Sequence, residues 1–166
     1  MRSGDGDLTM RLLGNIIWFI TGGWLLFLVY LFAAILFFPM FLPLLRVARY
    51  ALWPFGQDVV TQDELDEYRT LRQGVQSDSG LTAAGNALGG LGNLLWMLTF
   101  GWVIALIHLL AVIVNLGLIW LIVTIPNIGG NWKLMGVAFR PFNKVIVPAA
   151  LAQEIRENLA RSRLGI

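Results

Sequence analysis

One histidine lies inside a long uncharged stretch of this sequence and is its clearest candidate for chemistry. His108 falls between Asp78 and Lys133, and no residue between those two carries a formal charge. Histidine is the side chain that ordinarily changes charge near neutral pH, so its presence in an apolar segment indicates a proton or ion pathway. Tyr30 holds the matching position in a related stretch. The alternative is a histidine that forms a structural hydrogen bond with a neighbouring helix.

Few polar side chains accompany this histidine, and they limit the chemistry that we expect. Together with His108 and Tyr30, the pathway candidates are Asn115, Thr124 and Asn127. The apolar stretches hold no carboxylate, the chain has no cysteine, and no glycine-rich loop is followed by Lys-Ser or Lys-Thr. We therefore expect no catalytic residues, no metal site and no cofactor, and predict that the protein is not an enzyme.

The basic residues predict contact with lipid or another anion. Arg46 and Lys133 occupy matching positions after the apolar runs, and Arg140 and Lys144 follow in the basic C-terminal part. Such residues bind anionic headgroups, at about 1 kcal/mol each near the surface, or extend to the interface only to keep their charge in water. They flank apolar runs and do not form a stripe with stacking aromatics, so we expect no nucleic acid partner.

Composition places the chain in a membrane. Hydrophobic residues make up 57% and charged residues 13% of the sequence, and the mean hydropathy is +0.71. Uncharged runs of 34 and 54 residues lie between Arg11 and Arg46 and between Asp78 and Lys133, whereas a spanning helix needs about 20 residues. Six tryptophans flank or begin these runs, as anchors at the membrane surface do: Trp18, Trp24, Trp53, Trp96, Trp102 and Trp132.

The chain contains the same apolar unit twice. The stretch LGNIIWFITGGW (13–24) returns 78 residues later as LGNLLWMLTFGW (91–102). The match then resumes 87 residues apart, where Pro39 and the element WPFG (53–56) correspond to Pro126 and RPFN (140–143). The second copy thus has nine additional residues between its first helix and its proline. We predict a tandem duplication.

This duplication predicts an all-α membrane protein made of two helical hairpins. Both copies start and end alike, so we expect equal orientation, an even number of crossings each, and both termini and the connector in the cytoplasm, where Lys and Arg concentrate. Asn93–Val114 and residues 118–136 should form the second hairpin, with residues 115–117 as its turn. Proline and glycine should break the second arms. The first copy, shorter, should be bent or partly re-entrant near Pro39 and Pro43.

The predicted boundaries are 12–60 and 91–147 for the two membrane repeats, 61–90 for a cytoplasmic helix with a glycine-rich linker, and 148–166 for an amphipathic C-terminal helix. Thr61 and Glu64 have the spacing of a capping box at the start of the connector helix. The tail has a Leu151, Ile155 and Leu159 stripe with i, i+4 spacing, which predicts an amphipathic helix. Such a helix can lie on the membrane surface, pack against another subunit, or rest on its own protein with its other face in solvent.

These residues resemble a known family. Each copy has Asn-x-x-Trp and then Gly-Trp, a proline with a basic residue seven positions on, and an x-Pro-Phe element, and His108 lies six positions after Trp102. Over Leu12–Val60 and Leu91–Val147 this set resembles the YccF-type inner membrane component domain, in which two such units form one small bacterial protein. The resemblance implies residence in the bacterial inner membrane and implies no reaction.

Two functions remain open at this point. The first is a small homo-oligomeric protein that forms an ion or small-solute pathway, because discontinuous helices and repeats are common in transport proteins. The second is a membrane scaffold or accessory subunit that docks a protein partner through its cytoplasmic helices.

Overall fold

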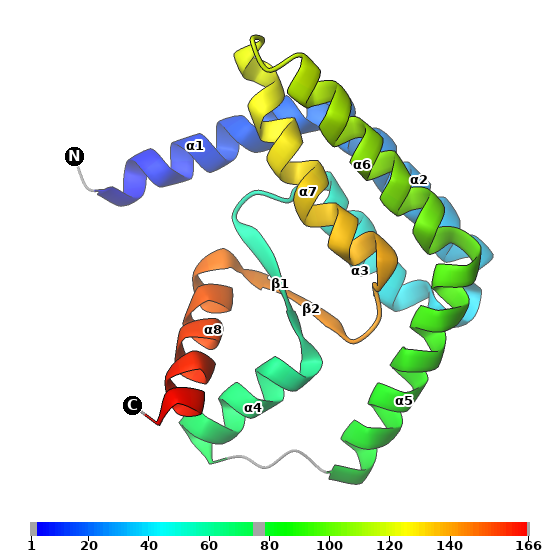
Figure 1. The fold of residues 1–166 in the computed structure, drawn as a ribbon, viewed down its shortest axis with the longest axis vertical. Helices are drawn as coiled ribbons and strands as arrows, with labels where there is room; N and C mark the ends of the chain where they lie inside the picture. Colours follow the sequence, from blue (N-terminus) through cyan, green and yellow to red (C-terminus); the bar gives the residue numbers. More distant parts are fainter. Residues whose placement is uncertain (1–2, 75–78, 166) are drawn as a thin grey trace.

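The two halves of the chain contain the same elements in the same order. In the computed structural model, which describes residues 3–74 and 79–165, the first repeat begins with one long bent helix and a short return helix (Figure 1). Its elements are α1 (Ser3–Trp18), η1 (Phe19–Gly23), α2 (Trp24–Leu36), η2 (Phe38–Met40) and α3 (Phe41–Leu52). The second repeat has α5 (Ser79–Trp96), η3 (Met97–Gly101), α6 (Trp102–Gly117), η4 (Ile122–Thr124) and α7 (Ile125–Phe139).

A short strand and a polar helix follow each hairpin. They are β1 (Gln57–Thr61) with α4 (Gln62–Gln73), and β2 (Lys144–Pro148) with α8 (Ala149–Leu164). The mainly helical class is therefore confirmed, and two helices, Gly6–Leu36 and Ala83–Gly117, are long and apolar enough to cross a membrane. The glycine-rich residues from Ser79 onward belong to helix α5, where we had expected a linker. The predicted linker residues 75–78 lie outside the described part of the chain.

The second arms of the hairpins are unbroken, and our prediction of proline and glycine breaks in them is wrong. Helix α7 runs without interruption through Gly129 and Gly130, and Pro126 lies in its first turn. A first-turn residue has no intrahelical acceptor for its N–H, so proline is tolerated there. The predicted turn at residues 115–117 is also wrong, because α6 continues to Gly117 and the chain reverses over residues 118–124.

The bend lies in the first arm of each hairpin. At η1 and η3 the α-helical pattern widens into one π-helical turn, and in η1 Gly22 leaves the helical region with φ 150°. The side chain of Trp18 fills the inside of the first bend against Gly23, and Trp96 does the same against Gly101. Both tryptophans are almost fully buried, at 2% and 0% exposure, so these two are structural residues and not the surface anchors that we expected.

An antiparallel two-stranded ribbon joins the two repeats, which the sequence did not lead us to expect. Val59 pairs with Ile146 at its centre, and Gln57 and Pro148 pair at one end. Val59 and Ile146 hold the same position in their repeats, so the ribbon obeys a local two-fold symmetry. Gly56 and Asn143 also correspond, and both have positive φ (94° and 58°). Asparagine adopts this left-handed conformation more readily than most residues, which explains how Asn143 can stand where the first repeat has Gly56.

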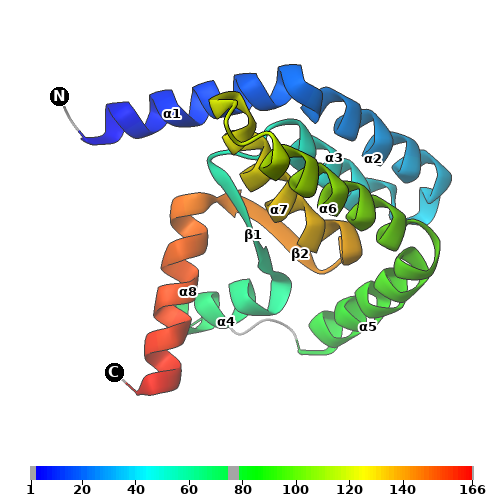
Figure 2. The same cartoon turned by 45° about the horizontal axis from the view of Figure 1, so that its top comes forward.

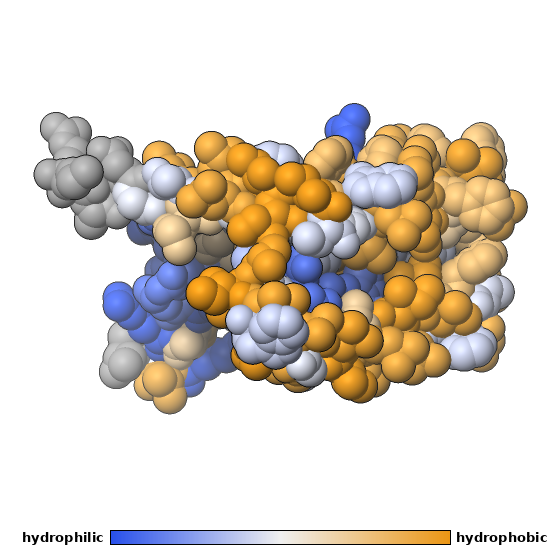
Figure 3. All heavy atoms as spheres, turned by 90° about the horizontal axis from the view of Figure 1, so that it is seen from above, coloured by the Kyte–Doolittle hydropathy of each residue, from blue (hydrophilic) through white to orange (hydrophobic). Residues whose placement is uncertain are grey.

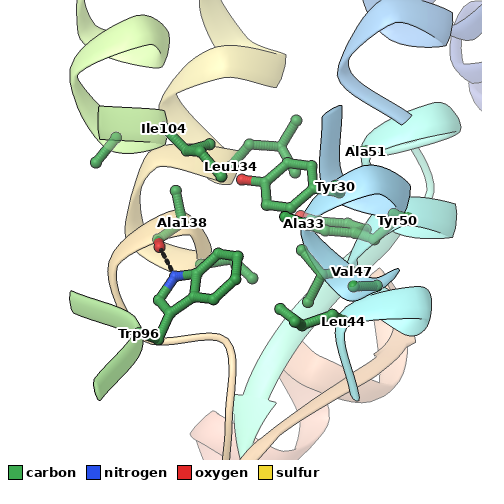
Figure 4. Packing of buried hydrophobic residues seen from close by; sticks show 14 of the residues in the cluster. Tyr30, Ala33, Leu44, Val47, Tyr50, Ala51, Trp96, Ile104, Leu134 and Ala138 are labelled. Atoms are coloured by element: carbon green, nitrogen blue, oxygen red, sulfur yellow. Dashed lines mark hydrogen bonds between the residues drawn. The ribbon is translucent and has the colours of Figure 1, made fainter. Parts of the chain in front are cut away.

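The elements form layers along the pseudo-two-fold axis. Helices α2 and α6 lie outermost, α3 and α7 come next, then the β1–β2 ribbon, and α4 and α8 lie at the other end (Figures 1 and 2). The core lies between the two hairpins and is made of residues such as Tyr30, Leu44, Trp96 and Leu134 (Figure 4). A smaller cluster with Val60 and Ile155 packs α4 and α8 on the ribbon.

Hydrogen bonds repeat between the halves in the same way. Trp96 Nε1 donates to Ala138 O over 2.7 Å (Figure 4). In the first repeat Trp18 Nε1 donates to Ala51 O, also over 2.7 Å. The predicted capping box is confirmed: the Thr61 hydroxyl accepts from the Glu64 amide, and the Glu64 carboxylate accepts from the Thr61 amide. The C-terminal helix begins at Ala149, directly after Pro148.

Candidate functional site

A buried histidine and tyrosine meet where the two repeats contact each other. Tyr30 on α2 and His108 on α6 are both fully buried, and the Tyr30 Oη and His108 Nε2 atoms lie 3.1 Å apart. His108 Nδ1 lies 2.8 Å from Asn131 Oδ1 on α7. A carbonyl oxygen only accepts, so Nδ1 carries the proton and Nε2 accepts from the Tyr30 hydroxyl. Both ring nitrogens are thus satisfied by a neutral histidine.

The hydrogen bonds continue from this pair toward the surface. Asn131 Nδ2 donates to Asn127 O over 2.9 Å, which is one helical turn earlier in α7. The Asn127 side chain in turn donates to Asn115 Oδ1 over 3.3 Å and accepts from the Thr21 hydroxyl over 2.8 Å. A continuous polar network therefore connects α1–α2, α6 and α7 inside an otherwise apolar layer.

The network opens into a pocket of about 160 Å³ between the first bend and α6. Thr21, Asn115, Asn127 and Asn131 supply its polar wall, and apolar side chains such as Ile107 complete it. Viewed from the end where α6 and α7 join, the surface is mainly apolar over the helices, with a small hydrophilic hollow among them (Figure 3). Fainter hydrophilic side chains gather behind and to the left of this apolar face (Figure 3).

The structure brings four of the five predicted pathway residues together. His108, Tyr30, Asn115 and Asn127 belong to the network, whereas the Thr124 hydroxyl bonds to Leu121 O and Leu118 O and closes the turn before α7. The sequence analysis missed two members, Asn131 and Thr21. Asn131 follows Asn127 by four residues, which is the spacing that puts two side chains on one helix face, and this signal was available.

The polar network breaks the symmetry of the fold. In the first repeat the positions of Asn127 and Asn131 are held by Met40 and Leu44, and His108 has Tyr30 as its counterpart. Thr99, the counterpart of Thr21, bonds only to the carbonyls of Leu95 and Trp96 in its own helix. Among the described residues the network therefore has no equivalent on the other side of the pseudo-two-fold axis, where Met40 and Leu44 replace the two asparagines.

The predicted lipid-contact residues lie around the ribbon. Arg46 is exposed on α3, beside Arg49 and a second pocket that Gln57 and Ile146 also line. Lys133 on α7 donates to Gln57 O over 3.3 Å. These charges lie on the ribbon side of the α3/α7 layer, where they can meet phosphate oxygens.

The other two predicted basic residues lie farther along the second repeat. Arg140 is exposed and lines a third pocket with Asn93, near the end of α5, and Met97, at the start of η3. Lys144, at the start of β2, is half-buried. The structure thus does not gather all four residues into one site.

Ion pairs and hydrogen bonds join α4 and α8 into a polar subdomain on the ribbon. Arg72 on α4 contacts Glu154 on α8 at 2.6 Å, and the Tyr68 hydroxyl donates to the same carboxylate. Arg156 contacts Asp58 of β1 at 2.8 Å. Burial alone raises the pKa of Asp58, but hydrogen bonds from Arg156 and the Val59 amide, with the charges of Arg156 and Lys133, bring it below the ordinary 3.8.

The chemistry of the site is that of a neutral polar relay. Among residues 3–74 and 79–165 no three His, Cys, Asp or Glu side chains are grouped so as to hold a metal ion. The network offers hydroxyl, amide and imidazole groups. These groups can form hydrogen bonds with water or a small polar molecule in the pocket, and an acceptor among them can bind a proton.

Comparison with known proteins identifies relatives of this chain. A family model described as the YccF inner membrane component domain matches residues 13–57 and 91–144. The chain is 29% identical over 160 residues to the inner membrane protein YccF of Escherichia coli (strain K12), covering 93% of this chain and 99% of the relative. The protein of the same name from Shigella flexneri matches with the same identity and coverage. No solved structure matches.

Proposed function

Because this chain belongs to the YccF inner membrane component domain family and is thus an inner-membrane protein, we propose that it forms a pathway for an ion or small polar solute. The observation that carries the proposal is the hydrogen-bonded network from Thr21 to Tyr30, which opens into a pocket inside the apolar layer. Unpaired polar groups cost several kcal/mol in hydrocarbon, so polar residues at this depth are functional candidates by default.

The proposal includes an assembly of several copies. The pocket is open on one side, and the network in one chain ends at the buried pair of Tyr30 and His108. Many apolar side chains of α6 face outward, including Leu110 at 52% exposure. In the proposed homo-oligomer such faces contact other copies or anionic lipid, and both termini lie in the cytoplasm.

Flux through reconstituted protein tests the proposal. The purified chain is placed in liposomes, and the flux of protons, monovalent cations and small neutral solutes is measured across several pH values. Asn127→Met installs the residue that the first repeat has at this position. It should abolish the flux because it removes the side-chain partner that Asn115 and Thr21 share. His108→Gln should keep hydrogen bonding but remove the dependence of the flux on pH.

Two matched threonines control this test. Thr21→Val removes a donor to Asn127 and should reduce the flux. Thr99→Val makes the same change in the other repeat, where the hydroxyl bonds only to its own helix, and it should leave the flux unchanged. Absence of any flux from the wild-type protein, or equal flux from both valine variants, would contradict the proposed pathway.

A platform for a protein partner is the second candidate, and the polar subdomain on the ribbon favours it. Helices α4 and α8 are held together by the Arg72–Glu154 and Arg163–Glu67 pairs, and Leu71 remains 50% exposed. A photocrosslinking residue at Leu71 should then yield one defined protein adduct in cells. The same residue at Leu110 on α6 should yield an adduct only with another copy of this chain, and identical adduct patterns at both positions would refute docking.

A further inference from the structure

The two hairpin turns are built from apolar residues and are exposed on the molecule. The first turn reads FFPM (37–40) and the second reads LIWLIVT (118–124). Phe38 is 76%, Trp120 73% and Ile122 79% exposed. A turn that emerged into water would expose these side chains at about 25 cal/mol per Å² of apolar area. A turn surrounded by hydrocarbon does not have this cost.

The helices that carry these turns are too short to cross the membrane. Each long apolar helix bends at its π-helical turn, after which α2 has 13 residues and α6 has 16. At 1.5 Å per residue they span about 20 and 24 Å, against a hydrocarbon core of about 30 Å. Neither hairpin therefore reaches from one aqueous phase to the other through α2 or α6 alone.

The pseudo-two-fold symmetry fixes how the hairpins face the bilayer. Helices α2 and α6 run in opposite directions, so the two turns lie at opposite ends of the pair (Figure 1). If this pair stood upright in the membrane, the ribbon with Lys133 and Asp58 beside it would fall near the bilayer centre. Each charge there costs about 2.5 kcal/mol or more. If the pair lies along the membrane plane, both turns have equal depth and the ribbon stays at one surface.

The distribution of charged residues fits a pair of helices, α2 and α6, that lies along the membrane plane. No Lys, Arg, Asp or Glu occurs in α2, in α6 or in either turn, whereas α3 carries Arg46 and Arg49 and α7 carries Lys133. The Lys133 contact with β1 marks the ribbon as the aqueous side of the α3/α7 layer. Packed helix layers are separated by about 8–10 Å, so the α2/α6 layer lies below the surface but short of the far side.

We infer that both hairpins are re-entrant: the protein inserts into the bilayer from the ribbon side only, and neither turn reaches the opposite aqueous phase. Helices α1 and α5 enter the lipid, α2 and α6 lie within it, and α3 and α7 return along the interface with their basic residues toward headgroup phosphates. This inference concerns membrane placement. Because neither turn reaches the far aqueous phase, it also requires that the proposed pathway cross the bilayer only in an assembly of several copies.

Cysteine labelling in intact cells and in inverted membrane vesicles tests the placement, because the natural chain has no cysteine. Single variants Phe38→Cys and Trp120→Cys are exposed to a membrane-impermeant maleimide, with Leu71→Cys on α4 as the control. We expect labelling of Leu71→Cys in inverted vesicles and of neither turn variant from either side. Both turn variants should react fully once the membrane is dissolved in denaturing detergent, which shows that the thiols are free and the protein is present.

Labelling of either turn from the outside of intact cells would overturn the inference, and labelling of the two turns from opposite sides would show the upright arrangement. A second measurement distinguishes protection of a turn by lipid from protection by the protein itself. A nitroxide carried on lipid acyl chains should quench a fluorophore at either turn to the same extent, and quenching that differs several-fold between the turns would contradict their equal depth. Loss of flux in the preceding assay leaves these outcomes unchanged.

Discussion

Tyr30 and His108 hold the same position in the two repeats and contact each other, with the Tyr30 Oη and His108 Nε2 atoms 3.1 Å apart. The histidine also bonds to Asn131, which has the apolar Leu44 as its counterpart. A symmetric framework thus holds an asymmetric pair at its centre. The departure from symmetry supplies the polar site.

Removing the imidazole should cost more stability than removing the tyrosine hydroxyl. His108→Phe leaves the Tyr30 hydroxyl and Asn131 Oδ1 without partners, whereas Tyr30→Phe leaves only one ring nitrogen unpaired. Each buried unpaired group costs about 1–3 kcal/mol. Denaturant unfolding in detergent, followed by tryptophan fluorescence, measures the difference. Greater destabilisation by Tyr30→Phe would show that the hydroxyl has a role beyond this hydrogen bond.

A methyl group at Gly130 should destabilise the hairpin contact. A Cβ atom there would overlap the ring of Trp18, which itself fills the first bend. Overpacking of this kind costs about 1–3 kcal/mol. Gly136→Ala is the matched control in the same helix, because nothing lies within 4 Å of its added Cβ, and it should stabilise by about 0.5–1 kcal/mol. Equal unfolding midpoints for the two variants would exclude the Trp18 contact as a constraint.

The two asparagine clamps should be equally sensitive to loss of their donors. Asn15 exchanges two hydrogen bonds with the backbone of Phe55, at 2.9 and 3.0 Å, and Asn93 does so with Phe142, at 3.1 and 3.0 Å. Asn15→Asp and Asn93→Asp keep the shape but place a carboxylate against a carbonyl oxygen. We expect each to lose about 1–3 kcal/mol in the same unfolding assay. A clear effect in only one repeat would contradict the equivalence of the clamps.

Acid should weaken the contact between α8 and the ribbon. The folded-state pKa of Asp58 is below the ordinary 3.8, so the ionised carboxylate stabilises the folded state. This contribution is complete above the ordinary pKa and is lost as the pH falls from there through the lower folded-state value. Amide exchange in α8, measured by mass spectrometry from pH 6 downward with correction for intrinsic rates, should rise across that range. Asp58→Asn should remove this dependence, and an unchanged profile would refute the assignment.

Repeated motifs made much of the helical framework predictable. The Asn-x-x-Trp elements and the two prolines mark equivalent arms, and Thr61 with Glu64 marks the start of α4. The bends were missed because Gly22 and Phe100 occupy corresponding positions, so no single residue type signals a π-helical turn. The broken-arm prediction failed because Pro126 acts at the first turn of a helix, where it does no harm.

The ribbon and part of the site depend on contacts that local patterns do not contain. The strands have five residues each and pair across more than 80 residues of sequence, and their apolar runs are too short to be separated from helix by periodicity. His108, Asn115 and Asn127 were identified because polar residues in apolar runs are rare. Thr21 joins them only because the first bend brings it to α7.

The self-matching register of β1 and β2 implies an ancestor of half this length. A strand whose central residue pairs with its own counterpart can complete the same ribbon with an identical chain, so one unduplicated unit would have formed a homodimer. Two copies in one chain can differ from each other, so one can carry asparagines without forcing a second polar pocket on the other.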